Sequence, residues 1–184
     1  MHLLSAVNPQ LTAHMDLATL CYSETAERLG IPNLPHNPSV IDNLRAVAEH
    51  VIEPIMGELN LAVTVTSGYR SPALNAAIGG AAASQHLTGQ AVDLIVGGVT
   101  HDLICDWISR TLDFDELILE KFDPAKAEFG WVHCSYAAGA NRRKVRTFDG
   151  RDYHDGLVFV GVRDDCLSPK IRSRPSLTPL KRPG

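Results

Sequence analysis

Apolar residues in the first third of the chain recur with the spacing of an amphipathic helix. From residue 37 onward the apolar positions are Val40, Leu44, Val47, Val51 and Ile55. This spacing is close to a period of about 3.6 residues, and it predicts a helix that begins near Asn37-Pro38. Pro54 is expected to bend or end this helix, since proline lacks a backbone N–H. An earlier helix is predicted over residues 16–29, with Gly30 as its stop signal.

Later segments alternate between apolar and polar residues or are rich in β-branched residues, as strands are. The strands predicted in this way cover residues 61–66, 90–96, 116–120 and 131–136. A helix capped by Thr100 is expected between the second and third of them, and a further hairpin within residues 147–163. Because helices come first and strands follow, the pattern indicates an α+β fold with an antiparallel sheet.

A single folded domain is predicted for residues 1–166, since a chain of 184 residues is long enough for one core. Residues 167–184 hold four prolines and five basic residues without an acidic one, and we expect a disordered basic tail there. The net charge of −4 argues against a dedicated nucleic-acid binder. No apolar run approaches the ~18 residues of a membrane span. We expect a monomer.

Three side chains, those of His86, Asp93 and His133, form the clearest candidate for a chemical site. Two imidazoles and one carboxylate suit Zn²⁺ and leave a fourth position open. Asp93 and His133 lie on two of the predicted strands, and antiparallel pairing of these strands would bring both within reach of one ion. The loop that carries His86 can fold back through Gly89 and supply the third donor. The sequence therefore predicts a zinc site formed by these three residues.

The motifs around these residues carry a family resemblance. They are Thr66-Ser-Gly-Tyr-Arg-Ser-Pro-Ala-Leu-Asn75, Gly79-Gly80, Ser84-Gln-His86, Ala91-Val-Asp93 and Trp131-Val-His133. Together they resemble the M15 zinc peptidases, which include D-alanyl-D-alanine carboxypeptidases and phage endolysin peptidases, and the M15A-type proteins of phages and prophages in particular. The resemblance covers roughly residues 10–150. It implies the hedgehog/DD-peptidase fold, which is a small antiparallel sheet flanked by helices.

The resemblance also implies roles for individual residues. His86, Asp93 and His133 match the zinc ligands of the family. Arg70 matches the arginine that holds a substrate carboxylate, and a planar guanidinium suits that task because it binds a carboxylate with two parallel hydrogen bonds. Ser84 matches a serine that contacts the substrate peptide in some members.

The general base is the point at which the sequence departs from the family. Many members place an acid three residues before the last ligand, where this chain has Gly130, and some place a histidine at the position of Trp131. The base is therefore expected elsewhere. Hedgehog-type domains carry a glutamate at the strand end that corresponds to Glu120, and Glu128 is the competing candidate. Trp131 either lines the substrate groove or packs in the core, and core packing is the favoured expectation.

These observations predict a zinc-dependent peptidase that acts on peptidoglycan stem peptides, either as a carboxypeptidase or as an endolysin-type endopeptidase. The alternative is a non-catalytic zinc-binding module of a virion or of the cell wall, which the glycine at position 130 favours. The N-terminus lacks the pattern of a signal peptide. We therefore expect synthesis in the cytoplasm and action on the cell wall after release through a holin-like pore or from a virion.

Overall fold

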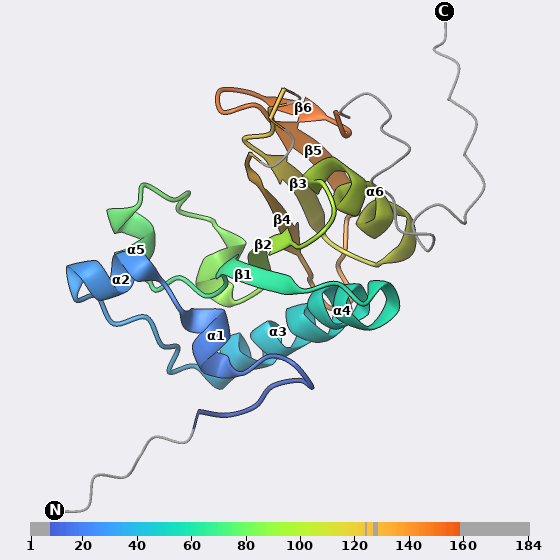
Figure 1. Ribbon diagram of the computed structural model, residues 1–184. Coiled ribbons are helices and arrows are strands. Elements are labelled where there is room, and N and C mark those ends of the chain that lie inside the picture. Colours follow the sequence, from blue (N-terminus) through green and yellow to red (C-terminus); the bar gives the residue numbers. More distant parts are fainter. Residues whose placement is uncertain (1–7, 124, 127–128, 159–184) are drawn as a thin grey trace, which may run out of the picture.

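The computed structural model describes residues 8–123, 125–126 and 129–158 (Figure 1). Its α-helices are α1 (Leu17–Cys21), α2 (Glu24–Leu29), α3 (Pro38–Val47), α4 (Glu53–Leu59), α5 (Pro72–Ala77) and α6 (His101–Thr111). A π-helical segment, η1 (Ala48–Ile52), joins α3 to α4, and a 3₁₀ turn, η2 (Gln85–Thr88), precedes the second strand. The strands are β1 (Val63–Ser67), β2 (Ala91–Val96), β3 (Glu116–Glu120), β4 (Trp131–Ser135), β5 (Lys144–Phe148) and β6 (Tyr153–Asp155). The predicted basic tail, residues 167–184, lies outside the described residues.

The single helix predicted over residues 16–29 is wrong, because this segment forms the two short helices α1 and α2. Ser23 separates them with an extended backbone, and its hydroxyl accepts a 3.2 Å hydrogen bond from the N–H of Ala26. This cap satisfies a free N–H and so favours the start of a new helix over continuation of the first. Gly30 ends α2 as predicted, with a φ of 64° in the left-handed region that suits glycine.

Pro54 does not end the helix that begins after Asn37, which continues through α3, η1 and α4 to Leu59. Proline cannot donate a backbone hydrogen bond, and its ring crowds the carbonyl of the residue four positions earlier. The π-helical turn of η1 lies directly before Pro54. It changes the hydrogen-bond spacing from four residues to five and thereby accommodates the proline within one continuous helix.

The described strands form one six-stranded sheet in the order β1-β2-β4-β3-β5-β6. Each predicted strand is found to within two residues, and the α+β class is confirmed. The prediction of an antiparallel sheet is wrong, because β3 and β5 are parallel and the sheet is mixed. The cause is the strand order: β2 occupies the other edge of β4, so the chain that leaves β4 returns to the free edge of β3 and runs in the direction of β3.

One row of side chains crosses the polar face of this sheet. Asp93 of β2 is paired with His133 of β4. His133 is paired with Ile118 of β3, and Ile118 with Arg146 of β5. Residues directly opposite one another on neighbouring strands point to the same face. The row therefore brings β5, which begins at Lys144 rather than within residues 147–163 as predicted, to the site that contains His133.

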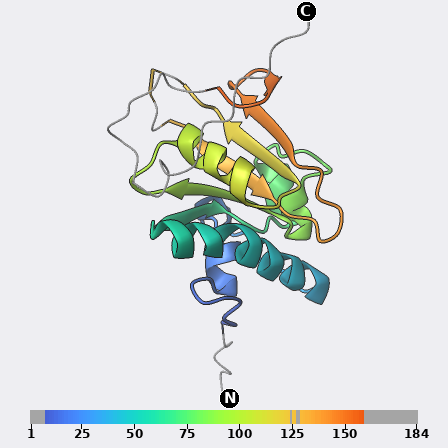
Figure 2. The ribbon, with the colours of Figure 1, turned by 90° about the vertical axis from the view of Figure 1, so that its right-hand side faces the viewer.

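The opposite face of the sheet is apolar and forms the core. Leu94, Leu119 and Val132 of the strands belong to one buried cluster with Val51 of the long helix and Ile104 of α6. Figures 1 and 2 show α6 and the helix α3–η1–α4 covering this face. Because packing fixes which face is buried, it also fixes the polar row on the open face. No helix in the described part of the chain is long and apolar enough to cross a membrane.

Candidate active site

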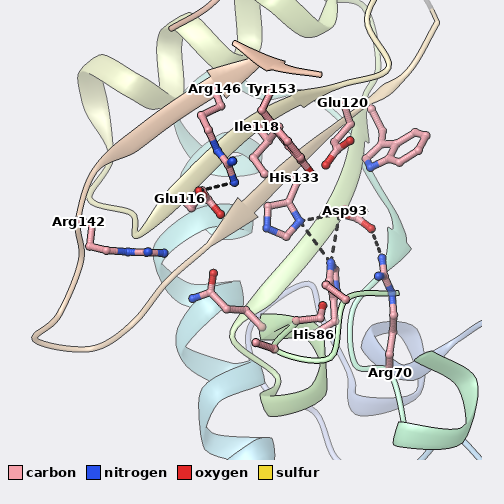
Figure 3. Close-up of a pocket in the computed structure, with 15 residues that line it drawn as sticks. Arg70, His86, Asp93, Glu116, Ile118, Glu120, His133, Arg142, Arg146 and Tyr153 are labelled. Atoms are coloured by element: carbon pink, nitrogen blue, oxygen red, sulfur yellow. Dashed lines mark hydrogen bonds and ion pairs between the residues drawn. The ribbon is translucent and has the colours of Figure 1, made fainter. Parts of the chain in front are cut away.

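A cavity of about 420 Å³ opens on the polar face of the sheet (Figure 3). The predicted site residues that the structure describes all line it: Arg70, Ser84, His86, Asp93, Glu120 and His133. The competing base, Glu128, lies outside the described residues. The topology thus gathers side chains from a loop, a 3₁₀ turn and three strands into one pocket.

Three of these residues form a group that could hold a metal ion. Their ligand atoms all lie within 4.8 Å of one another. Nδ1 of His133 lies 2.9 Å from Oδ1 of Asp93, and Nε2 of His86 lies 3.3 Å from each of these two atoms. Bonds of ~2.0–2.2 Å to one tetrahedral ion would place the donors about 3.3 Å apart. Two of the three separations equal this value and the third is shorter, so the three donors are close enough to share one ion.

His86 is held in the orientation that metal binding needs. Its side chain is 2% exposed, and its Nδ1 lies 2.7 Å from the carbonyl oxygen of Gly68. Since a carbonyl can only accept, Nδ1 carries the proton and Nε2 is free to face Asp93 and His133. A Cβ at Gly68 would lie 2.1 Å from the carbonyl oxygen of Leu20, so this position of the motif requires glycine.

The rest of the Ser-Gly-Tyr-Arg loop is fixed by backbone contacts. The N–H of Tyr69 donates to the carbonyl of Leu20 at 2.8 Å, and the N–H of Arg70 donates to the carbonyl of His86 at 3.1 Å. Asn33 is buried and donates to the carbonyl of Tyr69 at 3.0 Å. Sequence reasoning did not identify Asn33 as a positioning residue. An asparagine in a segment rich in proline was the signal available, because such a segment has few backbone partners of its own.

Arg70 directly contacts the metal group, which is the set of His86, Asp93 and His133 that could hold a metal ion. Its Nη2 pairs with Oδ2 of Asp93, and its Nε donates to the hydroxyl of Ser67 at 2.8 Å. Asp93 therefore presents one oxygen to the two histidines while the other is held by the guanidinium. Such a contact orients a ligating carboxylate and keeps it ionised.

The protonation states of the group suit metal binding. Burial opposes ionisation of Asp93, yet His86 and His133 hold the pKa of this carboxyl well below its usual range. Burial lowers the pKa of His86. At neutral pH Asp93 is ionised and His86 is neutral, and these are the forms that bind metals.

Glu120 lies at the end of β3 and faces the same pocket. Burial raises the pKa of its carboxyl above the ordinary value, although His133 acts in the opposite direction. Gly130 lies beside it, and a Cβ at Gly130 would be 2.1 Å from the carbonyl oxygen of Glu120. With a φ of 92° as well, position 130 has no room for an acidic side chain.

Trp131 lines the pocket, so its expected place in the core is wrong. It is paired with Glu120 across the strands, and Nζ of Lys121 lies 5.3 Å from the centre of its ring. The alternation of β4 could have revealed this, because Trp131 is two residues from His133 and shares its face. Ser84 precedes η2, and its hydroxyl forms no capping hydrogen bond there.

Sequence reasoning missed the side of the pocket formed by residues 142–153. Arg142, Arg146 and Tyr153 line it together with Glu116 of β3. In the sequence these arginines belong to the basic run of residues 141–146, to which the sequence assigned no role in the site. The period of two between Lys144 and Arg146 was the available signal, since it places both on one face of a strand.

Comparison with known families agrees with this geometry. A family model described as Peptidase M15 matches residues 13–135. The matched segment contains Arg70, Ser84, Glu120 and the metal group, and it ends with β4. A search of curated proteins found no match to the chain. The family match spans more than half of the 184 residues, and the chain therefore belongs to the M15 peptidases.

Proposed function

We propose that this peptidase is zinc-dependent and hydrolyses peptide bonds in the stem peptide of peptidoglycan. The observation that carries the proposal is the convergence of His86, Asp93 and His133 in one pocket with Glu120, a carboxyl whose pKa is raised. Two neutral nitrogens and a carboxylate are the donors of many catalytic zinc sites, in which a fourth position stays open. The hedgehog/DD-peptidase fold is part of the same proposal.

A bound zinc ion would act as a Lewis acid that polarises the scissile carbonyl and activates water. The chain itself supplies the proton transfer. Glu120 takes a proton from the attacking water and delivers it to the leaving amine. A carboxyl whose pKa is raised by burial is suited to both steps. Its pKa is shifted toward neutral pH, so the same group can accept a proton and later donate it. Position 130 cannot provide this group, as its glycine contacts the backbone of Glu120.

Arg70, which follows β1, and Ser84, which precedes η2, are proposed to bind the substrate. Nη2 and Nε of Arg70 are engaged by Asp93 and Ser67, and its remaining N–H groups are proposed to bind the terminal carboxylate of the peptide. This contact would fix which bond lies at the metal group. We further propose that the protein is phage or prophage encoded, is a monomer, and acts on the wall after release from the cell.

Digestion of purified peptidoglycan tests the proposal. We expect new stem-peptide termini in the mass spectrum of the fragments, loss of this activity on treatment with a chelator, and recovery on addition of zinc. The mass of the released fragment distinguishes a carboxypeptidase, which frees single D-alanine, from an endopeptidase. One bound zinc ion without turnover on any peptidoglycan would instead favour the non-catalytic module.

A further inference from the structure

The hairpin of β5 and β6 adds a side to the pocket that the family match does not include. The match ends at residue 135, whereas the hairpin begins at Lys144. Its Arg146 and Tyr153 nevertheless line the same cavity as the metal group. The matched segment already contains the proposed chemistry, so what the hairpin could add is indicated by the contacts of Arg146 and Tyr153.

The sheet fixes how far this side lies from the metal group. His133, Ile118 and Arg146 form one row across β4, β3 and β5. Neighbouring strands are about 4.8 Å apart, so His133 and Arg146 are separated by about 10 Å. An extended peptide rises about 3.3 Å per residue, and about three residues span this distance. Figure 3 shows Arg70 and Arg146 on opposite sides of His133.

The guanidinium of Arg146 is held in place by neighbouring side chains, but not all of its N–H groups have a hydrogen-bond partner. It stacks over the ring of Tyr153, with its central carbon 4.1 Å from the ring centre. Its Nη2 lies 2.7 Å from Oε1 of Glu116, an oxygen that Lys144 also approaches at 3.6 Å. Its Nε is buried without a hydrogen-bond partner in the described structure. Stacking covers one face of the guanidinium, Nε is shielded from solvent and Nη2 is held by Glu116, so Nη1, which forms no hydrogen bond in the described structure, is the group left for an acceptor.

The other arginine of this side is used differently. Arg142 forms a two-bond pair with Asp115, in which its Nε and Nη2 donate at 2.7 and 2.6 Å. Glu116, by contrast, is shared by two cations. Asp155 is paired with Arg146 in the strand register but is exposed, and the described structure shows no ion pair between them. Of the two arginines that line this side of the cavity in the described structure, Arg146 is therefore the one whose side-chain nitrogens are less fully paired.

We propose that Arg146, stacked on Tyr153, binds an internal carboxylate of the substrate about three residues to the amino side of the cleaved bond. The inference rests on the proposed function, which places the terminal carboxylate at Arg70 on the other side of the metal group. In a stem pentapeptide that ends in D-alanyl-D-alanine, the residue at this distance is the γ-linked D-glutamate, whose α-carboxylate is free. Arg146 thereby selects the acidic form of the stem peptide over its amidated form.

Two synthetic pentapeptides that differ only in this group, the free α-carboxylate or its amide, test the proposal. We expect the wild-type protein to cleave the acidic peptide with a kcat/KM about tenfold to a hundredfold higher, the range of a hydrogen-bonded charge pair. In Arg146→Gln this preference should fall below about twofold, through KM rather than kcat. Zinc content should stay unchanged, and cleavage of the amidated peptide should fall by much less than cleavage of the acidic peptide. The control is Arg45→Gln, which removes an exposed arginine of α3 and should keep the preference.

Equilibrium binding of the same two peptides separates this inference from the proposed activity. Binding that prefers the acidic peptide and loses the preference in Arg146→Gln supports the subsite even if neither peptide is cleaved, and in that case the proposed hydrolysis is wrong. A wild-type protein that binds and cleaves both peptides equally overturns the subsite. So does a preference that survives in Arg146→Gln.

Discussion

The two sides of the pocket differ in how tightly their polar side chains are held. On the metal side, His86 and Asp93 are buried, and each has a second contact that orients it, with Gly68 and Arg70 respectively. On the hairpin side every residue of β6 is exposed, and the guanidinium of Arg146 has a donor without a partner. Strands of one sheet contribute to both sides, but the side chains on the metal side are held by more contacts than those on the hairpin side.

This difference suggests that the two sides of the pocket have different functions. Metal ligands must be held within fractions of an ångström, and contacts that orient them are what provides this. Substrate contacts tolerate more freedom and can change with the sequence of an exposed hairpin. The family match agrees, because it includes the metal side and ends before β5. Substitutions on the two sides should accordingly affect different measured quantities.

The largest effect is expected from His133→Ala. This change removes one of three donors, and the two that remain should not retain the ion at neutral pH. Zinc content, measured by elemental analysis after dialysis, should fall from one ion per chain to near zero, and peptide hydrolysis should fall to background.

The matched control is His154→Ala on the hairpin, where the imidazole is exposed and pairs with Asp149. It should leave both zinc content and hydrolysis near the wild-type values. Retention of zinc and hydrolysis in His133→Ala would show that the metal side has been assigned incorrectly.

Glu120→Gln should separate metal binding from proton transfer. The amide keeps the size of the side chain but cannot accept the proton of water, and general acid–base groups contribute about a hundredfold to ten-thousandfold. We expect kcat to fall by this factor while zinc content stays at one ion per chain. Glu128→Gln is the comparison variant and should stay near wild type. If kcat falls in Glu128→Gln and stays near wild type in Glu120→Gln, the general base is Glu128.

Arg70→Lys tests the contact that holds Asp93. Lysine keeps the charge but cannot pair with Asp93 and Ser67 at the same time. Loss of a contact that orients a ligand weakens metal affinity about tenfold to a hundredfold. Competition with a chromophoric chelator measures this affinity. An unchanged zinc affinity with a raised KM would mean that Arg70 serves the substrate alone, and would remove one of the constraints that set the metal side apart.

The metal side could be predicted from the sequence because its residues lie in local patterns. Strand alternation places Asp93 and His133, and the glycine of the Ser-Gly-Tyr-Arg motif marks a close approach of two backbones. The hairpin side could not be predicted in this way. Its place in the pocket depends on the parallel pairing of β3 with β5, and strand order follows from which edge is free after β4 has paired with β2. Arg146 reaches the pocket because of this strand order, which depends on contacts between segments far apart in the sequence.

Asp115→Asn should have the smallest effect, because Asp115 holds the two sides together without taking part in either task. Its buried carboxylate accepts from Gln85, the neighbour of His86, at 2.9 Å, and from Arg142, which precedes the hairpin. The hydrogen bonds that Arg142 donates hold the pKa of the Asp115 carboxyl below its usual value. Hydrogen bonds to a charged group contribute about 1.5–3 kcal/mol, so the variant should lose about this much free energy of unfolding at pH 7.

The pH dependence of this loss identifies its cause. A carboxyl whose pKa is lower in the folded protein stabilises it fully above the unfolded pKa of about 3.9, and this contribution disappears as the pH falls toward the folded pKa. Urea unfolding should therefore show a constant difference between wild type and Asp115→Asn from about pH 5 to 8, and a shrinking difference below about pH 4. Asp42→Asn, which removes an exposed carboxylate paired with Arg45, should change stability by less than about 0.5 kcal/mol. A difference for Asp115→Asn that persists unchanged at low pH would mean that packing, and not the charge, joins the metal side to the hairpin side.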